Sequence, residues 1–227
     1  MELRRDKSLK HRGEGKQPLV TFDVKFLIES IPDCFEGKAE EASLFLFALH
    51  VGARAITCGN VWLCDIRKEV KEDDGRLFVN VRLMRCKGSS NCYHPVTLEK
   101  LSEEDKSLDA VYWLRKFILN KFGLDLYNEK LWPLKENGDK LLWSYGTEEM
   151  RTRLKKRLEL AGFPPEEFGF HSFRSCFLYS AILKAGVNRE ERDAVLETCA
   201  LIAGCIPFSK SEMTYVKRVA TRTIIAT

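Results

Sequence analysis

The sequence predicts a mainly α-helical (α+β) domain that carries one small antiparallel β-hairpin sheet. Apolar side chains recur every three or four positions over most of the chain, which is the spacing that buries one face of a helix. Residues 65–98 are the exception, because apolar and polar side chains alternate there on both sides of a stretch rich in turn residues. The chain has 227 residues, 44% of them hydrophobic, which suffices for one sizeable core.

The first 18 residues differ in composition from the rest of the chain. They are polar and basic, and they include Gly13, Gly15 and Pro18. We expect residues 1–18 to form a flexible basic arm and residues 19–227 to form a single domain. Contact with DNA phosphates and a nuclear address both fit the charge of the arm, and a solvated tail fits it equally well.

A buried helix is predicted over residues 39–51, which are almost wholly apolar after a Glu-rich start and are followed by Gly52. An amphipathic helix over residues 21–31 precedes it, and a short helix is expected to continue through residues 61–63. Arg54 comes directly after the buried helix. A guanidinium at such a place is a poor solvated charge, so it requires an anionic partner, either a carboxylate or a ligand phosphate.

Two extended segments predict the β-hairpin. Residues 76–84 place alternate apolar side chains on one face, and residues 93–98 return in extended form. Residues 85–91 between them are rich in turn-forming side chains. Lys87 lies in this turn. An exposed turn lysine is most often just solvated, but a hairpin tip can also deliver an ammonium group to a phosphate.

Helical periodicity accounts for most of the remaining chain. Residues 125–145 are the exception, and they are expected to form a loop that packs on the core through its aromatic side chains. The predicted helices span residues 108–122, residues 148–161, a segment from about His171 to Gly186, residues 190–202 and residues 211–219.

The helix over residues 148–161 is basic on the side opposite its apolar stripe. That side holds five cations, namely Arg151, Arg153, Lys155, Lys156 and Arg157. Such a face is either solvated or bound to a nucleic-acid backbone, and the residue types favour neither. The first four of these cations are the candidate DNA-binding residues.

His171 and Arg174 lie three positions apart at the start of a predicted helix, so their side chains share one face. The first N–H groups of a helix lack backbone partners and attract anions. An imidazole and a guanidinium at that place suit a phosphate or carboxylate oxygen. A satisfied histidine beside a surface arginine is the commoner explanation of such a pair taken alone, so the rest of the chain has to decide.

Composition excludes several classes of protein. No run approaches the 18 apolar residues that span a membrane, and the charged N-terminal stretch is unlike a secretory signal. The eight cysteines form no C-x-x-C pair and only four histidines accompany them, so no metal site is predicted. The apolar contexts of several cysteines indicate a reducing intracellular compartment. The net charge of +4 permits a nucleic-acid partner without requiring one.

Five candidate residues follow one another along the chain: Arg54, Lys87, His171, Arg174 and Tyr215. Their order and context resemble the catalytic domain of the tyrosine recombinases, the phage-integrase family, over roughly residues 20–220. The sequence around His171, His-Ser-Phe-Arg, resembles that of the divergent eukaryotic mobile-element members of this family more than that of the bacterial members. The matching segments are Ala48-Leu-His-Val-Gly-Ala-Arg54 with Val61-Trp-Leu-Cys-Asp65, the hairpin of Lys87, His171-Ser-Phe-Arg174, and Ala203-Gly-Cys205 leading to Met213-Thr-Tyr215.

This resemblance implies DNA strand cleavage and rejoining, in site-specific recombination or integration, through a 3′-phosphotyrosyl intermediate. It assigns Arg54 and Arg174 to a clamp on the non-bridging oxygens of the scissile phosphate. Tyr215 would be the nucleophile, and His171 would help it to lose its proton. Lys87 would protonate the departing 5′ oxygen. No metal or cofactor is implied, because the phosphotyrosyl bond stores the energy for resealing.

The resemblance also implies partners and a place in the cell. The partner would be double-stranded DNA, on which copies of the chain would self-associate, and the compartment would be the nucleus if the source is eukaryotic. The N-terminal DNA-clamping domain of the family is absent from this sequence. The chain would therefore be either a catalytic fragment or a protein that relies on its basic arm.

Two positions depart from the family pattern. An acidic residue usually stands three positions after the first arginine, where this chain has Thr57. A His or Trp usually precedes the nucleophile by about nine positions, and Cys205 occupies that region as a sixth candidate site residue. A thiol is a poor hydrogen-bond donor to phosphate. The distance from Arg174 to Tyr215 also indicates an insertion near residues 197–208. These departures are compatible with cleavage that is slow or dependent on a partner.

Three alternatives remain open at this point. The first is a domesticated or defective recombinase domain that binds DNA without cutting it. The second is a type IB topoisomerase-like enzyme, which shares the five-residue chemistry and would relax supercoils as a monomer. The third is an unrelated helical interaction domain, which the order of all five residues disfavours most.

Overall fold

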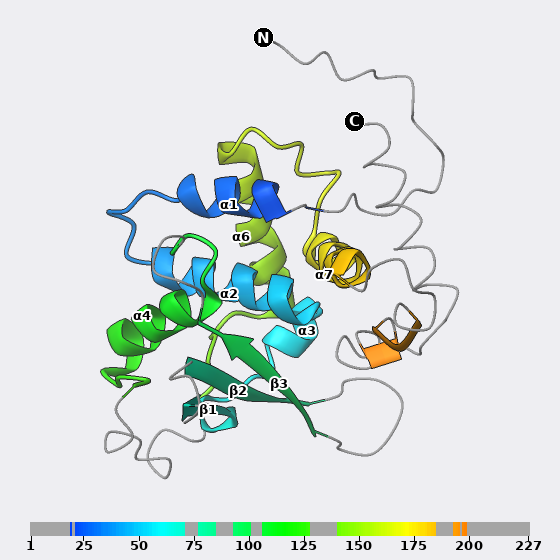
Figure 1. The fold of residues 1–227 in the computed structure, drawn as a ribbon. Coiled ribbons are helices and arrows are strands. Elements are labelled where there is room, and N and C mark those ends of the chain that lie inside the picture. Colours follow the sequence, from blue (N-terminus) through cyan, green and yellow to red (C-terminus); the bar gives the residue numbers. More distant parts are fainter. Residues whose placement is uncertain are drawn as a thin grey trace.

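The computed structural model describes residues 19, 21–70, 77–84, 93–100, 106–127, 140–184, 193–195 and 197–198. Within these ranges, helices pack beside a small antiparallel sheet (Figure 1), which confirms the predicted fold class. The elements are, in chain order, α1 (Thr21–Glu29), α2 (Lys38–Val51), α3 (Ala55–Cys58), the 3-10 turn η1 (Leu63–Asp65), β1 (Ile66–Val70), β2 (Leu77–Met84), β3 (Tyr93–Glu99), α4 (Ala110–Phe122), α6 (Thr147–Leu160) and α7 (Phe170–Lys184).

Helix α2 is the central helix and packs against both α4 and α7 (Figure 1). Its side chains are buried on nearly all sides, as the apolar sequence predicts. Gly52 ends the helix in the left-handed conformation, with φ 61°, and its N–H donates to the carbonyl of Ala48. A Cβ on Gly52 would lie only 2.6 Å from Cδ1 of Phe177 in α7. The backbone angle and the close approach of α7 therefore both require glycine.

The sheet has the strand order β1-β2-β3, with both pairs antiparallel. Val81 of β2 lies opposite Ile66 of β1 and Val96 of β3, and all three side chains are buried. The predicted single hairpin was incomplete, because β1 adds a third strand. Its sequence, Ile-Arg-Lys-Glu-Val, has three charged residues in the middle and lacks the alternation by which β2 and β3 were found.

The segment between α2 and the sheet also differs from the prediction. The expected helix over residues 61–63 is absent, since α3 ends at Cys58. Trp62 instead pairs with Leu141 in an isolated β-bridge. The Asp65 carboxylate accepts a hydrogen bond from the Trp62 N–H at 3.2 Å, which closes the turn η1. A local side-chain acceptor thus replaces the helical hydrogen bonds in this segment.

The core links α2 to the loop before α6. Trp143 is completely buried, and its ring centroid lies 5.0 Å from that of Phe47. Its indole N–H donates to the hydroxyl of Ser43 at 3.1 Å. On the other side of α2, Phe45 stacks on Phe173 of α7 with centroids 5.9 Å apart. The described end of the loop therefore packs on the core, as predicted.

Several predicted features lie outside the described residues. They are the basic arm of residues 1–18, Lys87 in its turn, Cys205, and the last helix with Tyr215. Parts of the helix predicted over residues 190–202 are described, and positions 193–195 and 197–198 are helical. Among the helices in the described ranges, none has the length and apolarity needed to span a membrane.

Candidate functional site

A pocket of about 370 Å³ opens where the N-terminal ends of α3, α6 and α7 meet. The α3 side of the pocket contributes Arg54, and the α7 side contributes His171. Helix α6 contributes Glu148, Arg151 and Lys155. Positions far apart in the sequence thus bring four nitrogen-bearing side chains and one carboxylate to a single cavity.

Arg54 owes its position to the end of α2. The left-handed turn at Gly52 reverses the chain, and Arg54 becomes the N-cap residue of α3, with φ −79° and ψ 155°. The side chain is partly buried and lines the pocket. The anionic partner expected for this guanidinium stays a prediction, and the pocket itself could not be identified from the sequence alone.

Arg174 lies beside the same turn. Its side chain is completely buried, and Nη1 donates to the carbonyl of Gly52 at 3.3 Å. A guanidinium inside a protein is costly unless acceptors or anions compensate its charge. The arginine predicted to lie on the face of His171 is therefore a core residue, held against the backbone two positions before Arg54.

The first turn of α7 fixes the direction of His171. The Ser172 amide donates to the carbonyl of Gly169 at 2.8 Å, and the Gly169 amide donates in return to the Ser172 hydroxyl at 3.1 Å. Ser175 in the next turn donates from its hydroxyl to the carbonyl of His171 at 3.0 Å. Because Ser172 is fully buried, His171 is left on the side of the helix that faces the pocket.

The environment of His171 lowers the pKa of its imidazole below the ordinary value of 6.5. The largest cause is desolvation, even though the side chain reaches solvent at the pocket. The positive charges of Arg174, Arg54 and Arg151 lower the pKa further, in that order. His171 is therefore neutral at pH 7 and is surrounded by guanidiniums that an anion would neutralise.

Helix α6 does not present its cations on one face. Arg151 and Lys155 are one turn apart and line the pocket, and Lys156 is exposed. Arg153 and Arg157 turn instead towards α2. Our expectation that Arg157 lies on the solvent side is wrong, because it is 6% exposed and pairs with a buried carboxylate. The sequence of α6 cannot reveal this, since the carboxylate is supplied by a distant helix.

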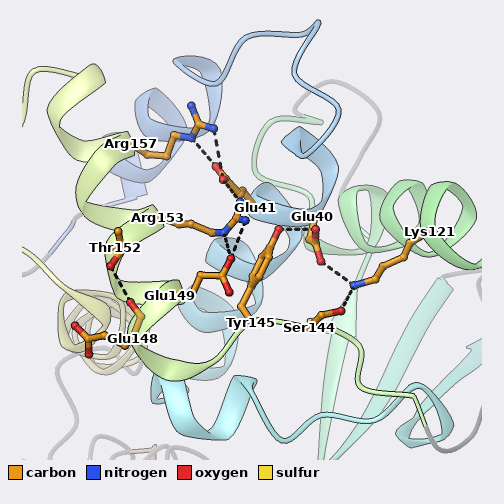
Figure 2. A network of polar contacts seen from close by, with 10 residues as sticks. All are labelled: Glu40, Glu41, Lys121, Ser144, Tyr145, Glu148, Glu149, Thr152, Arg153 and Arg157. Carbon is orange, nitrogen blue, oxygen red and sulfur yellow. Dashed lines mark hydrogen bonds and ion pairs between the residues drawn. The ribbon is translucent and has the colours of Figure 1, made fainter.

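That carboxylate is Glu41 in the first turn of α2 (Figure 2). It accepts hydrogen bonds from Nε of Arg157 at 2.5 Å and from Nη1 of Arg153 at 3.1 Å. Arg153 also binds Glu149 through Nη2 at 2.9 Å, and its guanidinium lies 3.9 Å from the ring centroid of Tyr145. Of the four candidate DNA-binding residues, Arg153 is therefore the one that reaches the buried Glu41.

A second set of contacts joins α2 to α4 (Figure 2). Glu40 accepts from Nζ of Lys121 at 2.9 Å and from the hydroxyl of Tyr145. Lys121 also donates to the hydroxyl of Ser144 at 2.7 Å. Together with the Glu41 contacts, these bonds fix α2, α4 and α6 relative to one another. They thereby set the distance between Arg54, which follows α2, and the pocket residues of α6.

Four of the predicted site residues, Arg54, Arg151, Lys155 and His171, line this one pocket. Arg174 is not among the lining residues and lies buried against the carbonyl of Gly52. The roles of Lys87, Cys205 and Tyr215 stay predictions, since these residues lie outside the described ranges. No group of three potential metal ligands is present among the described residues.

Glu148 is the pocket residue that the sequence analysis missed. The sequence could have indicated it, because Glu148 stands in the first turn of the helix and three positions before Arg151, a spacing that predicts a local ion pair. Thr57, at the position where the family pattern has an acid, lies in α3, and its amide donates to the carbonyl of Arg54 at 2.9 Å. The pocket nevertheless has a carboxylate, which comes from another helix.

Several solved structures have a similar arrangement of helices and strands. The chain matches the XerH site-specific recombinase in its post-cleavage complex with a palindromic difH substrate, with a TM-score of 0.60 and 15% identity. The chain has the fold of the tyrosine recombinase catalytic domain. XerA recombinase, with a TM-score of 0.52 at 16% identity, and a lambda integrase dimer bound to a COC′ core site, with 0.51 at 11%, match as well.

The recombinase fold accounts for nearly the whole chain. The three matches cover 94%, 96% and 91% of it, but only 53%, 66% and 50% of the respective solved chains. The sequence thus spans about half to two thirds of these recombinases. No family model and no curated protein matches the sequence itself. An unrelated helical fold, one of the alternatives above, is excluded.

Proposed function

We propose that this chain cleaves and rejoins DNA strands through a 3′-phosphotyrosyl intermediate. The observation that carries the proposal is that Arg54 and His171, from two distant parts of the sequence, line one pocket, while Arg174 of the same helix as His171 is held against the turn that precedes Arg54. A phosphodiester carries one negative charge, and its pentavalent transition state carries more. A site that gathers guanidiniums before the substrate arrives stabilises that added charge without reorganisation.

Arg54 and Arg174 would bind the non-bridging oxygens of the scissile phosphate. Arg174 is completely buried and hydrogen-bonded to Gly52, two positions before Arg54, so its guanidinium is held in place and would reach the phosphate only if the substrate opens the pocket towards it. His171 is neutral at pH 7 because its pKa is lowered, so one ring nitrogen can accept a proton while the other donates a hydrogen bond. It is therefore suited to assist deprotonation of the nucleophile.

The remaining steps fall to residues outside the described ranges. The phenolate of Tyr215 would attack the phosphorus, and the bond from phosphorus to the 5′ oxygen would break. Lys87 would supply the proton that the departing 5′ oxygen takes up. In resealing, the 5′ hydroxyl of the same or another strand attacks the phosphotyrosyl bond, and Tyr215 leaves. Bonds and protons balance without a metal, a nucleotide or another cofactor.

The proposed partner is duplex DNA, with the exposed cations of α6 as phosphate contacts. Arg151, Lys155 and Lys156 are accessible for that role, whereas Arg153 would first have to leave Glu41 and Glu149. Self-association on DNA is part of the proposal, because recombination joins strands from two duplexes. Relaxation of supercoils by a monomer would favour the type IB topoisomerase-like alternative.

A second candidate function is DNA binding without cleavage by a domesticated or impaired recombinase domain. Thr57 and Cys205 favour it, because each replaces a side chain that the family pattern uses near the phosphate. Incubation with nicked suicide duplexes separates the two functions. Cleavage traps the protein on the DNA as an adduct that survives denaturing electrophoresis. Tight binding without any adduct would support the non-cutting candidate instead.

A further inference from the structure

The α6 side of the pocket carries a charge pair that the proposed cleavage chemistry does not use. Nη1 of Arg151 donates to Oε2 of Glu148 at 3.0 Å, and both residues line the pocket with Arg54 and His171. Glu148 is the one carboxylate among the described residues that line it, against the full positive charges of Arg54, Arg151 and Lys155. An internal anion thus occupies one guanidinium of a basic cavity.

This pair is loosely held. The side chains of Arg151 and Glu148 are 56% and 82% exposed, so water competes with their contact. Exposed ion pairs of this kind are weak, because solvent screens the charges and both side chains lose freedom. Arg151 can therefore leave Glu148 at little cost when a stronger anion enters the pocket.

A neighbouring pair on α6 provides the contrast. Arg153 also binds an acidic residue of the first turn, Glu149, but it reaches the buried Glu41 as well. Figure 2 shows Glu149 within that group and Glu148 pointing away from it. Of these two pairs, the one formed by Glu148 opens on the pocket and the one formed by Glu149 is fastened to α2.

We infer that Arg151 binds a DNA phosphate in the pocket, next to the phosphate held by Arg54 and His171, and that Glu148 occupies Arg151 until DNA displaces it. This rests on the proposed function and deepens it by assigning Arg151 to a phosphate inside the pocket and by adding Glu148 as an internal competitor. A phosphate offers two oxygens to the planar fork of a guanidinium, and in this pocket the charges of Arg54 and Lys155 attract it as well. Arg151 and His171 line the same pocket, and the charge of Arg151 acts on the imidazole, so phosphates bound by the two side chains would be neighbours.

Binding of a labelled duplex to the full chain carrying Tyr215→Phe tests the exchange, since no covalent step can interfere. Glu148→Gln should tighten binding about two- to fivefold, the range that corresponds to an exposed ion pair. Glu149→Gln removes the same charge one position along the helix and is the matched control, with a smaller gain. Arg151→Ala should weaken binding about tenfold, lower the salt slope by about one, and cancel most of the Glu148→Gln gain.

The inference is overturned if Glu148→Gln gains no more than Glu149→Gln, or if its gain is undiminished in the Arg151→Ala background. A second measurement follows the imidazole signals of His171 by NMR while inorganic phosphate is added. Phosphate should shift these signals in the parent and much less in Arg151→Ala, whereas Lys116→Ala, which removes a distant exposed charge on α4, should behave as the parent does. Equal phosphate-induced shifts of the His171 signals in the parent and in Arg151→Ala would also overturn the inference.

The two measurements separate this inference from the proposed function. If the parent binds no duplex and forms no adduct, the proposed function fails, and the phosphate titration still decides whether Arg151 and Glu148 form an anion site. If adducts form but neither variant has its expected effect, the cleavage proposal stands and the inference fails.

Discussion

Nη1 of Arg174 donates a hydrogen bond to the carbonyl of Gly52 at 3.3 Å, although the two residues are 122 positions apart in the sequence. This contact joins α7 to the turn that ends α2. Arg54 follows that turn directly, and His171 lies one helical turn before Arg174. A single contact thus connects the segments that carry three of the proposed site residues.

Arg174→Lys should fold but lose the proposed reaction. Lysine keeps the charge, yet it cannot reproduce the planar fork that reaches a carbonyl and a phosphate together. The rate of adduct formation should fall by about a hundredfold or more, while duplex affinity changes much less, since many other phosphate contacts remain. Single-turnover assays on suicide duplexes and binding titrations measure the two effects. Equal losses of affinity and rate would contradict a clamp that acts on the transition state.

Gly52→Ala should destabilise the protein more than Gly123→Ala does. Both glycines end helices with positive φ, 61° and 68°, so each substitution costs about 1 to 2 kcal/mol through the backbone. A Cβ at Gly52 also collides with Phe177, whereas a Cβ at Gly123 meets no described atom within 4 Å. The collision adds about 1 to 3 kcal/mol. Urea unfolding measures both variants, and equal losses of stability would refute the close packing of α7 on the turn.

The fold class was predictable because the apolar run of α2 and the apolar periodicity of α4 and α6 are local signals. Strand β1 was missed, because the charged run Arg67, Lys68 and Glu69 lacks the alternation of apolar and polar residues, and the strand forms by pairing with β2. Arg54 and His171 stood out by their places at element ends. The burial of Arg157 could not be predicted, because its partner Glu41 lies 116 positions away. Contacts between distant segments carry information that no local pattern contains.

Glu41→Gln should be among the most destabilising changes at a charged residue. It leaves the guanidinium of Arg157 buried without its carboxylate, and breaking a buried pair in this way costs about 3 to 5 kcal/mol. Glu149→Gln removes a partner of Arg153 at a half-exposed place, so it should cost about 1 kcal/mol or less. Denaturant midpoints with unchanged slopes would report the difference. A mild effect of Glu41→Gln would mean that solvent reaches this pair.

The lowered pKa of His171 makes stability depend on pH. Above about pH 6.5 the imidazole is neutral in both the folded and the unfolded chain, so its contribution is fully present. As the pH falls below that value, the unfolded chain takes up the proton first, and stability is lost until the folded imidazole is protonated too. His171→Gln should therefore flatten the fall in melting temperature between about pH 7 and pH 5. An identical pH profile in the parent and the variant would contradict the lowered pKa.

Identification of the residue that becomes attached to DNA tests the central claim most directly. The adduct formed on a suicide duplex is digested with protease and nuclease, and mass spectrometry locates the modified peptide. We predict a nucleotide on the hydroxyl of Tyr215, and a Tyr215→Phe protein that folds, binds duplex DNA as the parent does, and yields no adduct. An undiminished yield of adduct from Tyr215→Phe, or a modified peptide that contains another tyrosine such as Tyr179 or Tyr145, would contradict the proposed mechanism.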